Sequence, residues 1–230
     1  MALDPRSQYT TQTVSRAGAG IDEGLRSYML RVYNYMAGGL VLTGVVAYAT
    51  SQSPALLELI YGNTLVFWVV MLAPLGLILF GFRASVSAGT AQVIYWLFSG
   101  LMGLSLSYVF LAYTGASVTR VFFITAGTFT AMSLYGYTTK RDLTGIGSFL
   151  IMGLIGLIIA SVVNIFMQSA AMEWVISVIG VLIFVGLTAY DTQKIKNDYN
   201  ETDDRELMTK KAVFGALRLY LDFINLFLFL

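Results

Sequence analysis

Two aspartates in apolar surroundings are the residues of this sequence best suited to carry out chemistry. Asp222 lies in GALRLYLDFINLFLFL, residues 215–230, between Leu221 and Phe223. A carboxylate is costly to bury in such a segment, so its presence indicates a partner or a function. Asp191 lies in GLTAYDTQKIK, near the end of the preceding hydrophobic segment. Two carboxylates that meet at low dielectric cannot both ionise freely and tend to share one proton.

Such a pair could change its protonation near neutral pH, bind a divalent cation through oxygen ligands, or act as an acid–base pair. Other polar residues of the hydrophobic segments are candidates to support it. Arg218 and Asn225 lie one turn to either side of Asp222, and Arg83 follows the apolar stretch LILFGF. Asn164 lies in another hydrophobic segment, where an interhelical hydrogen bond is the simpler interpretation.

Each charged candidate also has a purely structural interpretation. Asp222 could form a local ion pair with Arg218, four residues earlier on one helix face. Asp191 could pair with Lys194 where its helix meets water, and Arg83 could extend its guanidinium to the membrane surface. We favour a functional role for Asp222, because a membrane helix has no structural need for a carboxylate. We expect Asp191, Asp222 and Arg83 to converge in the cytoplasmic half of the membrane.

The composition indicates that a lipid bilayer surrounds these segments. The chain has 230 residues, of which 57% are hydrophobic and 12% charged, whereas soluble domains have about 25% charged residues. It contains no cysteine and no histidine, which excludes disulfides, thiolate or imidazole metal sites and histidine acid–base chemistry. The basic residues form no patch, so we expect no nucleic-acid partner.

Seven hydrophobic segments are long enough to cross the membrane as helices, which takes roughly 20 residues. None shows the alternation of a strand. We therefore expect an all-α membrane protein with a seven-helix transmembrane domain at 28–230, after a polar cytoplasmic tail at 1–27 that is not a cleavable signal peptide. The expected spans are 28–50, 63–82, 91–113, 118–138, 145–167, 172–193 and 212–230.

The basic residues predict the orientation of these spans. Twelve of the 14 lysines and arginines lie in the N-terminal region or in alternate connections, all on one side of the membrane. By the positive-inside rule that side is cytoplasmic, so seven spans place the C-terminus outside. The last segment reaches Leu230 without a polar flank, which leaves open that the hydrophobic stretch continues further.

The two aspartate motifs resemble those of the Bax inhibitor-1 (transmembrane Bax inhibitor motif) family. AYDTQKIK, residues 189–196, and LYLDFINLFLFL, residues 219–230, carry the resemblance, which extends over nearly the whole chain. The short loops resemble bacterial members, so we expect an integral protein of the bacterial inner membrane. The resemblance implies a seven-helix fold in which the last helix is central and the others surround it.

The family resemblance also implies a function and its residues. It implies a pH-sensitive calcium leak in which Asp191 and Asp222 sense protons and bind calcium, the transported ion. The stretch LFGFR is similar to the segment that carries the family's arginine latch, which identifies Arg83 with that latch. We expect Arg83 to pair with Asp191 in the closed state. Protons, calcium and lipid are then the partners, and no cofactor is expected.

Two other classes of function remain open. The first is a non-transporting regulator that binds other membrane proteins, such as a quality-control protease, and the sequence barely distinguishes it from a channel. The second is an intramembrane aspartyl protease, which also needs two membrane aspartates. Those enzymes have a Gly-x-Gly-Asp pattern, whereas Leu219, Tyr220 and Leu221 precede Asp222 here. We therefore expect that the protein is not an enzyme.

Overall fold

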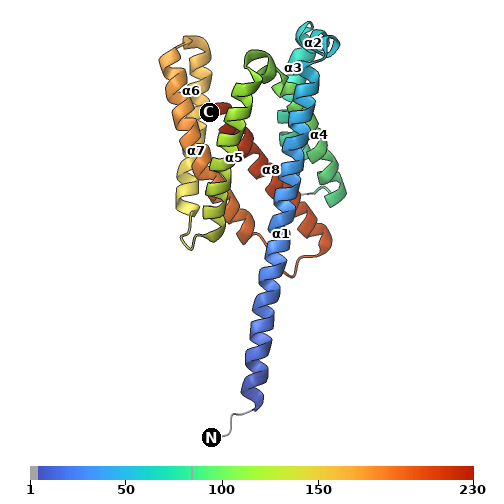
Figure 1. Ribbon diagram of the computed structural model, residues 1–230, viewed down its shortest axis with the longest axis vertical. Coiled ribbons are helices and arrows are strands. Elements are labelled where there is room, and N and C mark those ends of the chain that lie inside the picture. Colours follow the sequence, from blue (N-terminus) through green and yellow to red (C-terminus); the bar gives the residue numbers. More distant parts are fainter. Residues whose placement is uncertain (1–4, 84) are drawn as a thin grey trace.

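The computed structural model describes the backbone of residues 5–83 and 85–230, and side chains from residue 23 onward apart from residue 84. Within these ranges the fold is all-α, with eight α-helices and one π-helix (Figure 1). The elements are α1 Pro5–Ser51, α2 Pro54–Tyr61, α3 Thr64–Gly76, η1 Leu77–Gly81, α4 Ala88–Ala112, α5 Gly115–Thr138, α6 Thr144–Met167, α7 Ala170–Asn197 and α8 Arg205–Phe229.

The last helix, α8, lies in the middle of the bundle, as expected. It runs obliquely between α5, α6 and α7 on one side and α1, α3 and α4 on the other (Figure 1). It packs against α1, α4, α5 and α7, whereas α6 packs only on α7 in the described ranges. In the apolar stretch of α8, 61% of the residues are buried by the rest of the protein, whereas in that of α6 only 6% are. The middle of α8 is therefore largely enclosed by protein, while α6 faces outward.

Six of the described helices are long and apolar enough to cross a membrane. They include the Glu23–Ser51 part of α1 and the continuous stretch Thr64–Gly81 formed by α3 and η1. The expected span 118–138 corresponds to α5, which does not belong to these six. Its sequence carries several threonines and serines and Arg120, which lower its hydropathy. The count of seven spans therefore stays a prediction. The side chains of most of the expected tail, 1–27, lie outside the described part, so that domain boundary also stays a prediction.

A buried hydroxyl cluster joins α8 to α1 and α4. The Thr43 hydroxyl donates to the carbonyl of Ser99 at 2.8 Å and lies 2.7 Å from the Tyr220 hydroxyl. Because the single hydrogen of Thr43 is used on the carbonyl, Tyr220 must be the donor to Thr43. Tyr220 is fully buried and makes an edge contact with Phe98 at 5.4 Å between ring centroids. These contacts fix the rotation of α8 and thereby the direction in which its other face points.

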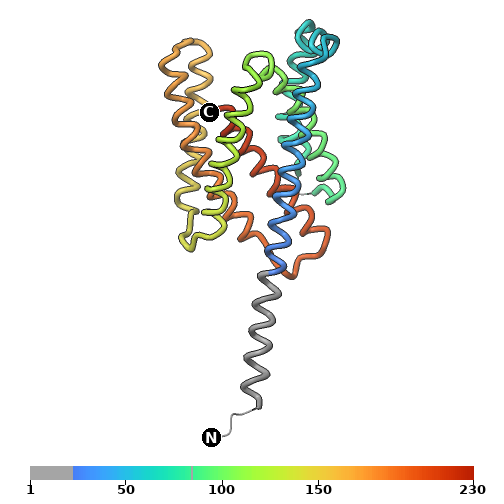
Figure 2. The backbone as a smooth tube through the Cα atoms, in the orientation of Figure 1, coloured from blue at the N-terminus to red at the C-terminus, as the bar shows by residue number. Residues whose placement is uncertain are grey.

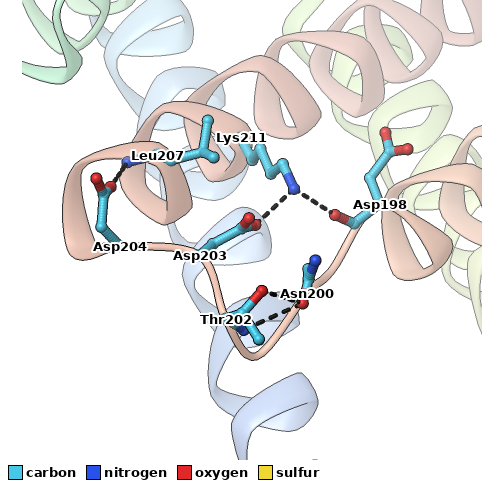
Figure 3. A network of polar contacts seen from close by, with 7 residues as sticks. All are labelled: Asp198, Asn200, Thr202, Asp203, Asp204, Leu207 and Lys211. Atoms are coloured by element: carbon cyan, nitrogen blue, oxygen red, sulfur yellow. Dashed lines mark hydrogen bonds and ion pairs between the residues drawn. The ribbon is translucent and has the colours of Figure 1, made fainter.

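The connection between α7 and α8 is short and tied down by one lysine (Figure 3). The Lys211 ammonium donates to the Asp198 carbonyl at 2.9 Å and also pairs with the Asp203 carboxylate. Asp204 caps the start of α8 by accepting from the Leu207 amide at 2.7 Å, which satisfies a backbone donor that the helix leaves free. The loop thus sets the relative placement of the two aspartate-bearing helices.

Candidate functional site

Asp222 is a buried carboxylate with an unsatisfied oxygen. The residue is 4% exposed, and within the described part of the chain no hydrogen-bond donor reaches its Oδ2 atom. Asn225, one turn further along α8, donates to the Leu221 carbonyl at 2.8 Å instead. Buried polar groups are nearly always hydrogen-bonded, so an exception indicates a place for a proton, an ion or water.

Asp191 on α7 forms an ion pair with Arg218 on α8. The distance from Arg218 Nη1 to Asp191 Oδ1 is 3.4 Å. The side chain of Asp191 is 16% exposed and that of Arg218 is 46% exposed. Arg218 thus holds its charge near the carboxylate while part of its guanidinium reaches out of the bundle. The expected convergence of the two helices therefore involves a third charge, on α8 itself.

The three charges lie close enough to influence one another. Asp222 interacts electrostatically with both Asp191 and Arg218. Lys194, one turn after Asp191 on α7, also interacts electrostatically with Asp191, so two cations lie near the two carboxylates when both are ionised. A proton on either carboxylate would leave the group with an excess of positive charge. The arrangement can therefore respond to pH.

A chain of hydroxyl groups ends at Thr192, the residue that follows Asp191 on α7. The Tyr33 hydroxyl on α1 lies 2.6 Å from Ser133 Oγ on α5, which lies 3.0 Å from Thr192 Oγ1 on α7. Ser133 and Thr192 are buried, and Thr192 directly follows Asp191. The chain joins three helices at the level of the site. Nothing in the sequence singles out these residues, because serines, threonines and tyrosines are common in membrane helices for packing alone.

Residues that follow Asp191 on α7 hold the neighbouring loop in place. Gln193 accepts from the Leu143 amide at 2.8 Å and donates to the Arg141 carbonyl at 2.7 Å. Lys196 donates to the Tyr137 carbonyl at 2.8 Å. The motif that carries Asp191 therefore also anchors the connection between α5 and α6. Its polar residues were visible in the sequence, although their partners were not.

The approach of α5 to α7 depends on a glycine. A Cβ atom at Gly136 would clash with the backbone of Ala189. Gly136 lies one turn from Ser133, and Ala189 lies two residues before Asp191. The glycine therefore allows the close backbone contact that brings the hydroxyl chain to the site.

Two other predicted site residues lie elsewhere. Arg83 is exposed in the connection between η1 and α4, and within the described residues its side chain forms no ion pair. The expected pair with Asp191 is replaced here by Arg218–Asp191, because α8 presents its own arginine to α7. Asn164 lies near the end of α6, where its side chain accepts from the Ser169 amide at 3.1 Å. Asn164 therefore stabilises the turn between α6 and α7. Within the described residues it forms neither the expected interhelical hydrogen bond nor a contact with the aspartates.

The location of the site follows from the path of the chain. Asp191 lies in the last third of α7, towards the end that carries the α7–α8 loop. The tube in Figure 2 shows that this loop lies at the same end of the bundle as the α5–α6 connection. Among the described residues there is no group of three or more acidic side chains that could hold a metal ion. The two aspartates alone offer fewer ligands than the six to eight oxygens typical of a calcium site.

The fold and site define a helical membrane protein with two aspartates on neighbouring helices, one of which is buried. The model of the family described as "Inhibitor of apoptosis-promoting Bax1" matches residues 25–230. The chain therefore belongs to the Bax inhibitor-1 family, and the resemblance seen in the two aspartate motifs is confirmed.

Several bacterial proteins are similar over nearly their full length. The protein RP147 of Rickettsia prowazekii is 50% identical, covering 96% of this chain and 94% of its own. A Caulobacter vibrioides protein is 51% identical over 94% of this chain and 90% of its own. The inner membrane protein YbhL of Escherichia coli is 48% identical over 90% of each chain. The names of these relatives denote no enzyme.

Proposed function

We propose that this protein is a calcium leak channel of the bacterial inner membrane, controlled by protonation of Asp191 and Asp222. In this proposal the chain crosses the membrane seven times, because α5 spans it in addition to the six long apolar helices, and the N-terminus lies in the cytoplasm. The name of YbhL supports the choice of membrane, and the excess of basic residues on one side supports the orientation.

The unsatisfied carboxylate of Asp222 is the observation that carries the proposal. A structural aspartate in a membrane helix would be expected to find hydrogen-bond donors, whereas Asp222 Oδ2 finds none in the described residues. Ionised Asp222 offers a carboxylate oxygen that no donor in the described residues occupies, which favours a cation over an anion as its ligand. A calcium ion that binds only two carboxylates and water would also be able to leave, as conduction requires.

The proposed control by pH uses the ion pair between α7 and α8. When Asp191 is ionised, Arg218 ties the two helices together. When pH falls and a proton neutralises Asp191, the attraction is lost and the helices can separate. Protonation then shifts the population towards the conducting state, because the ion pair stabilises only the closed one.

Calcium flux into proteoliposomes tests the proposal. Vesicles that contain the purified protein and a calcium-sensitive dye should admit calcium faster than empty vesicles, and faster again at acid pH. Vesicles with Asp222→Asn protein, at the same protein content, serve as the matched control. Flux equal to that of empty vesicles, with folded and inserted protein, would contradict the channel and favour a non-transporting regulator.

A further inference from the structure

An apolar cavity separates α1 from α5 in the half of the bundle that contains the α5–α6 loop. Its volume is about 490 Å³, within the range of small-molecule pockets. Within the described ranges the backbone of α1 approaches α4 and α8, and that of α5 approaches α7 and α8, but the backbones of α1 and α5 do not approach each other. The seam therefore stays open between two helices that both face the bilayer.

The walls of the cavity are apolar and its inner end is polar. Met29 and Leu30 of α1 face Phe129 and Leu134 of α5. Leu30 is 51% exposed and Leu134 is 61% exposed, so the cavity opens sideways to lipid. Its lining also includes Tyr33, whose hydroxyl bonds Ser133 across the seam. A hydrocarbon chain could enter between the helices without breaking that bond.

The end of the cavity near the α5–α6 loop carries positive charge. Arg26 lines it and is exposed, and within the described part of the chain it has no ion-pair partner. Lys196 lies near the same end, because its ammonium donates to the carbonyl of Tyr137, another lining residue. Two acidic residues, Asp22 and Glu23, lie about one turn before Arg26 in the sequence. Glu23, the one whose side chain is described, does not line the cavity. Basic pockets between membrane helices are typical binding sites for anionic lipid headgroups.

We propose that this cavity binds an anionic phospholipid, with one acyl chain between α1 and α5 and the headgroup phosphate on Arg26. Charge complementarity identifies the headgroup as anionic, and the lateral opening identifies the bilayer as its source. The bound chain would lie against Tyr33 and Ser133, the first two members of the hydroxyl chain that ends beside Asp191. The lipid site does not depend on calcium conduction and can be tested without it.

Native mass spectrometry of the purified protein tests the lipid site. The protein is mixed with phosphatidylglycerol or with phosphatidylcholine of the same acyl chains, and the bound lipid is counted. We expect one phosphatidylglycerol to be retained several-fold better than phosphatidylcholine. Arg26→Gln should remove that preference, whereas Arg120→Gln, on α5 near its opposite end, should keep it.

Substitutions that fill the cavity with a larger side chain distinguish lipid binding inside the cavity from non-specific adhesion of lipid to the protein surface. Thr130→Trp or Leu134→Trp should reduce binding of both lipids, because each side chain is exposed and its replacement projects into the cavity. Gly44→Trp is the matched control, since it fills a different cavity on α1 and a Cβ there meets no neighbour. Unchanged phosphatidylglycerol binding in the tryptophan variants would show an adventitious lipid only. Loss of binding in these variants with an intact preference in Arg26→Gln would overturn the headgroup assignment.

Discussion

Arg218 on α8 and Asp191 on α7 form an ion pair with 3.4 Å between Nη1 and Oδ1. Asp222, one turn further along α8, is buried and lacks a donor for Oδ2. Because the Arg218 side chain is 46% exposed, the pair resembles surface pairs, which contribute about 1 kcal/mol or less. A contact of that strength is suitable for a switch, since a single protonation event can shift its balance.

Replacing Arg218 tests whether this ion pair holds the closed state. Arg218→Gln leaves Asp191 without its partner and should raise calcium leak at neutral pH. A loss of about 1 kcal/mol corresponds to a roughly fivefold shift in population. Dye-loaded proteoliposomes at pH 7 measure the effect, with Arg120→Gln as the control for removal of one positive charge. Equal flux in the two variants would argue against the ion pair as a restraint.

Arg83 distinguishes the latch that the family resemblance implies from the contact seen here. Its guanidinium is exposed and is not ion-paired in the described residues, so Arg83→Ala should raise neutral-pH leak less than Arg218→Gln does. The same liposome assay compares the two. If Arg83→Ala gave the larger increase and a weaker response to acid, Arg83 would have to reach an aspartate in another conformation.

The close contact of α5 with α7 should be sensitive to a single methyl group. At Gly136 a Cβ would clash with the backbone of Ala189, whereas at Gly127, on the same helix, it would meet no neighbour. Gly136→Ala should destabilise the fold by about 1–3 kcal/mol, the usual cost of overpacking. Gly127→Ala should be neutral or slightly stabilising because alanine favours helix. Thermal unfolding in detergent compares them, and similar midpoints would contradict the packing.

Accessibility of single cysteines tests the seven-span orientation. The chain has no cysteine, so each introduced thiol is the only one. Cysteines at Asn63 and Glu173 should react with an impermeant maleimide from outside intact cells, and one at Thr139 only after lysis. Asn63 precedes α3, Glu173 lies in the first turn of α7 and Thr139 follows α5. Reversed labelling would invert the orientation, and labelling of Thr139 from outside would remove α5 as a span.

The sequence revealed the aspartates but not their surroundings. Asp222 was identifiable because one carboxylate in an apolar segment stands out, and the central position of α8 followed from the family resemblance. The partner of Arg218 was not identifiable, since its spacing of four residues from Asp222 suggested a pair within one helix. Only the rotation of α8, fixed by contacts such as that of Tyr220 with Thr43, directs Arg218 towards α7.

The polar residues of the site differ from the expected set for a related reason. Asn164 was chosen because an amide in a hydrophobic segment is conspicuous, yet it serves the turn between α6 and α7. Ser133 and Thr192 are far less conspicuous, and their contact depends on how α5 and α7 approach each other. Partners across helices depend on packing, which residue type and spacing do not specify.

The pH dependence of calcium flux in the two aspartate variants tests the central claim most directly. Flux is measured in proteoliposomes from pH 8 to pH 5 for the wild type, Asp191→Asn, Asp222→Asn and the double variant, with Asn164→Asp as a control that keeps both site carboxylates. Protonation neutralises Asp191, which pairs with Arg218 in the closed state, so wild-type flux should rise as pH falls. Each single variant should flatten that rise, and the double variant should abolish it and bind calcium most weakly. A double variant with wild-type flux and wild-type pH response would contradict the proposed role of Asp191 and Asp222.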